Sequence, residues 1–213
     1  MIKKPTKTVV TTALLGFVWV AAVASGLWVL LKYESTPGRT GAVPSSWPRD
    51  SMISLGKDRP TLIMVAHPYC PCTRASMDEF ARVMAQAQSK VYAYVLFYTP
   101  PDASSSGATQ PAWENTELRR RAMQIPGVTV LSDVNGAEAH RFGAETSGHT
   151  FLFDPTGRLL FNGGITQSRG HAGDNEGESA VISMISNAIS PLAKTLVFGC
   201  SLTDRDRKKA CLK

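Results

Sequence analysis

The chain has 213 residues, of which 19% are charged, with a formal net charge of +6 and four cysteines. The excess positive charge lies in residues 1–7 and 204–213, so the chain between them is neutral, which argues against nucleic acid as a partner. Four cysteines suit an oxidising compartment but are too few for a disulfide-dense scaffold, so the fold must depend on a hydrophobic core of ordinary domain size.

The chain begins with a candidate membrane anchor. No charged residue occurs between Thr8 and Leu31, and about 20 apolar residues suffice for a helix to cross a bilayer. We expect a transmembrane helix over residues 8–32, with residues 1–7 in the cytoplasm because three lysines precede the helix. The alternative is a signal peptide cleaved after Ala22-Val23-Ala24, but the apolar run continues past that point. The anchored reading predicts a single-pass protein of the bacterial inner membrane with its domain in the periplasm.

The anchor is followed by a segment rich in Pro, Gly and Ser, residues 33–57, which we expect to be a flexible linker. One domain is expected over residues 58–194. A basic, cysteine-containing tail is expected over residues 195–213.

The pattern of apolar residues predicts the elements of this domain in chain order. They are a strand at 61–66, a helix at 73–88, a strand at 91–98, a helix near 115–124, a strand at 128–131, a helix at 136–142, a hairpin with arms at 150–153 and 159–161, and a helix near 178–192. This order predicts an α/β fold in which crossover helices join parallel strands and an antiparallel hairpin follows.

Cys70-Pro71-Cys72 lies between the first predicted strand and the first predicted helix of the domain. Free N–H groups and the helix dipole favour a thiolate at the start of a helix. The motif therefore indicates redox chemistry or the binding of a soft metal, with Cys70 as the nucleophile and Cys72 as the second thiol. Two buried structural cysteines are the alternative.

The element order and the cysteine pair together resemble the thioredoxin superfamily, in its membrane-anchored, exported branch. Three further segments are similar to RedB-type proteins: His67–Ala75, Gly163–His171 and Val197–Cys200. The resemblance implies a thioredoxin-like domain that exchanges disulfides with exported protein thiols or disulfides and requires no cofactor.

The chain departs from the thioredoxin pattern at two positions. Thr73 stands where the family has its second cysteine, because Cys72 comes one residue early, and a disulfide in so small a ring would be strained and oxidising. His149 stands where the family has a cis-proline.

His149 opens a second interpretation, in which Cys70, Cys72 and His149 bind copper or zinc. This set is similar to the ligands of the Sco-type copper proteins, although only one residue separates the two cysteines here. The partner would then be a metalloprotein acceptor.

Five other residues are candidates for accessory roles. His67 either acts as a base beside the thiols or fills the loop. Arg169 and His171 lie on a long polar connection that should border the cysteines, where they contact a ligand or are merely solvated. Cys200 either forms a disulfide with Cys211 or folds back to resolve or ligate with the Cys70 pair.

Overall fold

The computed structural model describes residues 7–87, 89–101, 113–186 and 192–203, and the chain divides into two units, residues 1–36 and 37–213. The first unit contains α1 (Lys7–Ser35), a helix of 29 residues whose most apolar window has a mean hydropathy of 2.3. A helix this long and apolar can cross a bilayer, and an N-terminal signal sequence shares both properties.

The second unit is built on a five-stranded sheet in the order β3-β2-β1-β4-β5. The strands are β1 (Thr61–Ala66), β2 (Tyr92–Thr99), β3 (Val128–Val134), β4 (His149–Phe153) and β5 (Leu159–Gly163). β1, β2 and β3 are parallel to one another, whereas β4 is antiparallel to both β1 and β5. The predicted α/β fold, with parallel strands followed by an antiparallel hairpin, is confirmed.

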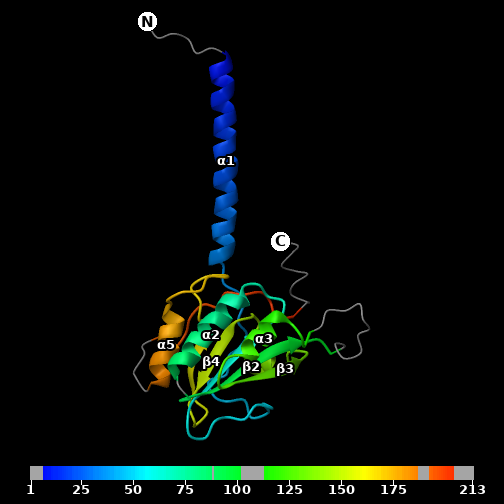
Figure 1. The fold of residues 1–213 in the computed structure, drawn as a ribbon, viewed down its shortest axis with the longest axis vertical. Helices are drawn as coiled ribbons and strands as arrows, with labels where there is room; N and C mark the ends of the chain where they lie inside the picture. The colour runs from blue at the N-terminus through cyan, green and yellow to red at the C-terminus, as the bar shows by residue number, and fades with distance from the viewer. Residues whose placement is uncertain (1–6, 88, 102–112, 187–191, 204–213) are drawn as a thin grey trace. The chain divides into compact units, whose positions relative to one another are not determined.

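One face of the sheet is covered by α2 (Thr73–Ala87), α3 (Glu117–Met123) and α5 (Glu176–Ile185), as Figure 1 shows. Met77, Phe80 and Met84 point from α2 into the core on this face, at the helical spacing seen in the sequence. β1 is buried on both sides because its side chains alternate between this core and the core on the opposite face. The cysteine motif therefore follows a strand that is fixed at the centre of the sheet.

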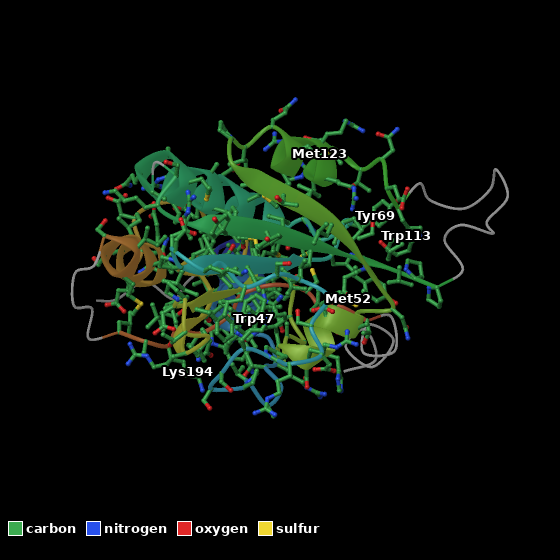
Figure 2. The ribbon with its side chains drawn as sticks, turned by 90° about the horizontal axis from the view of Figure 1, so that it is seen from below. Trp47, Met52, Tyr69, Trp113, Met123 and Lys194 are labelled. Atoms are coloured by element: carbon green, nitrogen blue, oxygen red, sulfur yellow. The ribbon has the colours of Figure 1, made fainter. Side chains whose placement is uncertain are left out.

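The opposite face is covered by α4 (Ala137–Arg141) and by residues 37–57. The prediction of a flexible linker is wrong for this segment, because Trp47 packs edge-on against Phe142 and Phe153 at 5.2 Å between ring centroids and Ile53 is buried. Figure 2 shows Trp47 on the side of the sheet away from α2. The apolar side chains of residues 37–57 bury enough surface to order this segment, although its Pro, Gly and Ser content suggested a flexible linker.

The chain after α5 also belongs to the domain, so the predicted boundary at residue 194 is wrong. Asn162 donates its backbone N–H to the carbonyl of Ala193 at 3.0 Å, which lays residues 193–196 along β5. Val197 and Leu202 are then buried. The rest of the predicted tail, residues 204–213, lies outside the described residues.

Candidate functional site

The cysteine motif forms a tight turn between β1 and α2. The backbone N–H of Cys70 donates to the carbonyl of His67 at 3.0 Å, and that of Thr73 donates to the carbonyl of Cys70 at 3.2 Å. Thr73 is the first residue of α2, so Cys70 lies before the unpaired N–H groups of a helix of 15 residues. The local geometry is the one that the sequence predicted.

A third thiol joins the pair from the C-terminal segment. The Sγ atoms of Cys70, Cys72 and Cys200 all lie within 4.8 Å of one another, and the backbone N–H of Cys200 donates to Cys70 Sγ at 3.4 Å. Cys70 is 2% exposed and Cys72 is 8% exposed, whereas Cys200 is half-buried. The three sulfurs therefore form one cluster, the three-thiol cluster, and the C-terminal segment covers part of it.

Ser147, which the sequence analysis did not single out, holds the three segments of the cluster together. Its N–H donates to the carbonyl of Cys200 at 2.8 Å, and its hydroxyl accepts from the N–H of His67 at 2.7 Å. The same hydroxyl lies 2.6 Å from that of Thr73 at the start of α2. A serine directly before the glycine that precedes β4 was the only sequence signal for this role.

Arg169 lies beside the cluster, as the resemblance implied. Its guanidinium donates to the carbonyl of Gly199, next to Cys200, and its positive charge acts to lower the pKa of Cys72. His171 is exposed and is not part of the three-thiol cluster. Arg169 therefore fixes the C-terminal segment and contributes positive potential to the site.

The three thiols do not share their protons equally. Hydrogen bonds from the Cys200 thiol and then the Cys72 thiol lower the pKa of Cys70, with help from the Thr73 hydroxyl and the Cys200 N–H and against the effect of burial. The Cys200 thiol also acts to lower the pKa of Cys72, but Cys70 and burial outweigh it, so that pKa is raised. Cys70 and then Cys72 raise the pKa of Cys200. The pKa is thus lowered at Cys70 and raised at Cys72 and Cys200, so Cys70 is the cysteine of the cluster that loses its proton most readily.

The two predicted histidines lie elsewhere. His149 is fully buried with its ring tilted by 31° against that of Phe151, at 4.1 Å between centroids, on the face of the sheet that carries Phe153. It is not in the three-thiol cluster, so the predicted ligand set of Cys70, Cys72 and His149 is not the one that the fold brings together. The reason is strand alternation, because His149 lies on the same side of β4 as Phe151.

Burial and the charge of Lys194 lower the pKa of His149 to about 3. Within the described part of the chain, neither of its ring nitrogens has a hydrogen-bond partner. His149 is therefore a neutral residue of the interior at ordinary pH.

His67 belongs to an aromatic group beside the motif. Its ring stacks on Tyr98 at 5.8 Å and meets the edge of Trp113 at 5.6 Å, and its Nδ1 accepts from the N–H of Tyr69 at 3.2 Å. Figure 2 shows Tyr69 and Trp113 next to each other at one end of the domain. His67 thus shapes the loop, and the structure does not bring it into the three-thiol cluster.

A groove of about 350 Å³ reaches the motif from this aromatic side. Its walls are residues 68–71, Arg74 and residues 115–118. Arg74 and Glu117 form an ion pair of 3.1 Å across it. The groove offers a partner a path toward Cys70.

The polar connection after β5 is tied to α2 by buried carboxylates. Glu79 and Glu178 are almost fully buried, and Glu79 accepts from the backbone N–H of Gly173 at 2.7 Å. Arg82 pairs with Glu79 at 3.2 Å and with Glu178 at 3.3 Å. Burial, and then the neighbouring Glu79, raise the pKa of Glu178 to about 7.

The predicted disulfide between Cys200 and Cys211 involves a residue outside the described part of the chain, since Cys211 lies in 204–213. Cys70, Cys72 and Cys200 are all free cysteines in the structure. The alternative expectation, that Cys200 folds back toward the pair, agrees with the observed cluster.

Comparisons with known proteins find structures that share the architecture of this chain at low sequence identity. No protein-family model matches the chain, and no curated protein matches it significantly. A crystal structure of an uncharacterized conserved protein from Geobacillus kaustophilus is similar over 79% of this chain and 92% of its own, with 17% identity and a TM-score of 0.53. A hypothetical protein from Sinorhizobium meliloti 1021 is similar over 78% and 93%, with 18% identity and a TM-score of 0.51.

These likenesses concern the fold alone, because the identities are low. The sheet order, the parallel strands with crossover helices, the antiparallel hairpin and the cysteine motif at the start of α2 agree with the fold that the sequence predicted. The described residues between 37 and 203 thus form a domain with a thioredoxin-like fold.

Proposed function

We propose that this protein is a membrane-anchored, exported thiol–disulfide oxidoreductase in which Cys70 is the nucleophile. The observation that supports the proposal best is the setting of Cys70 Sγ: it lies directly before the first turn of α2, within 4.8 Å of two other thiols, and accepts the backbone N–H of Cys200 at 3.4 Å. Donors of this kind stabilise a thiolate, which is the reactive form in disulfide exchange.

The reaction consists of two exchanges. The Cys70 thiolate attacks one sulfur of a partner's disulfide, forms a mixed disulfide and releases the partner's other sulfur as a thiolate, which takes up a proton. Cys72, as the sequence suggests, or Cys200 then attacks Cys70 Sγ, gives its proton to solvent and releases the second partner thiol. The partner is reduced by two electrons and the protein is oxidised by two, and the reverse sequence oxidises a partner.

Access is the geometric requirement of this mechanism, because Cys70 is only 2% exposed. The groove beside Tyr69 has Cys70 among its lining residues, and along it an extended peptide carrying the disulfide would approach. The C-terminal segment must shift only enough to free Sγ. A protein partner with exposed cysteines on a flexible segment fits this approach best.

The anchor gives the domain its compartment. We propose that α1 is retained, with the N-terminus in the cytoplasm and the domain in the periplasm, because an exported location provides partner disulfides. Cysteine labelling with a membrane-impermeant maleimide in intact spheroplasts would test this topology. Labelling only after lysis would contradict it.

Exchange is tested on the full-length protein in detergent, reduced beforehand and mixed with a disulfide-containing peptide. Cys70→Ser should abolish formation of the mixed disulfide, whereas Cys211→Ser should leave the rate unchanged. Cys72→Ser and Cys200→Ser each report resolution, because loss of the resolving thiol makes the mixed disulfide with Cys70 accumulate, as seen by mass spectrometry. Wild-type exchange by Cys70→Ser would overturn the proposed function.

A further inference from the structure

The three-thiol cluster has the composition of a metal site as well as that of a redox site. Its members come from two segments 130 residues apart in the chain, and all three sulfurs lie within 4.8 Å of one another. Exchange requires only two thiols. The convergence of a third therefore calls for a second explanation.

We propose that Cys70, Cys72 and Cys200 form a three-thiolate site for a soft monovalent metal ion, with Cu(I) as its ligand class. Cys200, which the sequence offered as one alternative ligand beside the pair, takes the place that the copper or zinc interpretation gave to His149. The site also stands independently of disulfide exchange, since it concerns binding by the reduced protein.

The distances suit such a site. A metal that lies about 2.3 Å from each of three sulfurs places those sulfurs about 4 Å apart. The observed limit of 4.8 Å for every pair means that closure around an ion requires shifts of less than about 1 Å.

The donor set favours Cu(I) over harder or higher-coordinate ions. All three donors are sulfurs, and thiolates select Cu(I) and zinc over hard cations. Structural zinc almost always takes four protein ligands, and among the described residues no carboxylate or imidazole completes the cluster. Three-coordination by sulfur is an ordinary state for Cu(I).

The surroundings would protect the bound ion. Cys70 and Cys72 are nearly inaccessible to solvent, and Val197 and Phe198 bury the segment that delivers Cys200. Arg169 lies against the carbonyl of Gly199 and offsets part of the negative charge of three thiolates. A dry, sulfur-lined pocket with one nearby cation is suited to holding a monovalent ion in its reduced state.

The proposal is tested by anaerobic titration of the reduced, full-length protein in detergent with Cu(I) held by a bicinchoninate competitor. We expect one Cu(I) per chain, and X-ray absorption should show three sulfur neighbours and no nitrogen. Cys70→Ser, Cys72→Ser and Cys200→Ser should each weaken binding by more than about 100-fold, beyond the loss typical of an outer-shell partner. Cys211→Ser and His149→Ala are the matched controls and should bind as tightly as wild type.

Each other outcome overturns the site. Unchanged Cu(I) affinity in Cys200→Ser would mean that only Cys70 and Cys72 bind the ion. A loss of Cu(I) affinity in Cys211→Ser or His149→Ala would mean that the ligands include a residue outside the three-thiol cluster. Tight four-coordinate binding of zinc in preference to Cu(I) would contradict the three-coordinate assignment. Failure of Cu(I) binding with intact disulfide exchange would refute this site alone, whereas Cys70→Ser that retains exchange would refute only the proposed function.

Discussion

Buried, neutral His149 should make the domain less stable in mild acid, and the size of the effect follows from its pKa. An unfolded chain protonates this imidazole near its ordinary pKa of 6.5, but the folded chain does so only near pH 3. Stability that is fully present above pH 6.5 is therefore lost as the pH falls toward 3. At pH 5 the unfolded state binds almost a full proton that the folded state excludes, which corresponds to about 2 kcal/mol.

The measurement is equilibrium unfolding of the full-length protein by urea in detergent at pH 7.5 and pH 5.0, followed by near-UV circular dichroism. His149→Leu removes the titrating ring and keeps an apolar side chain beside Phe151. Wild type should lose about 2 kcal/mol more than this variant between the two pH values. His140→Leu, at an exposed position of α4, is the control and should behave as wild type.

An equal pH dependence in wild type and His149→Leu would refute the reasoning. It would mean that the folded protein accepts a proton on His149, through water or a hydrogen-bond partner. The difference between variants also cancels contributions from other groups, such as Glu178, that titrate in the same range.

Three further perturbations test other parts of the structure. Gly199→Ala places a methyl group against the Ser147 carbonyl. It should lower the free energy of unfolding by about 1–3 kcal/mol and speed alkylation of Cys200 at pH 8.5. An unchanged alkylation rate would contradict the packing of that segment. Glu178→Gln should raise the free energy of unfolding more at pH 8 than at pH 5. The pKa of Glu178 is raised in the folded protein, so the stability that its protonated form contributes is lost as the pH rises through about 7. A larger gain at pH 5 would mean that the pKa of Glu178 is not raised. Trp47→Ala should cost about 2 kcal/mol, somewhat less than a fully buried tryptophan, and a neutral result would restore the flexible linker.

The sequence was sufficient for the features that depend on local pattern. Continuous apolar runs located β1 and β2, helical spacing located α2, and the hairpin followed from its alternating arms and turn. The cysteine motif at the start of α2 follows from the same local rules. The fold class could then be predicted because element order restricts the sheet to few topologies.

The flexible linker and the domain end were mispredicted because composition does not reveal which few side chains find a partner. Trp47 and Ile53 are scarce among Pro, Gly and Ser, yet they pack against the sheet. Residues 193–202 lack a periodic pattern, but residues 193–196 run along β5 and residues 200–202 bond to residues 145–147. Such contacts join residues far apart in the chain, and no local rule contains them.

The site shows the same division. By itself the sequence determined that Cys70 and Cys72 lie at a strand-to-helix turn, because that placement depends only on neighbouring residues. Only the tertiary structure decided that Cys200, and not His149, completes the cluster. Strand alternation turns the histidine to the other face of the sheet, and the hydrogen bond from Ser147 to the carbonyl of Cys200 draws the distant thiol in.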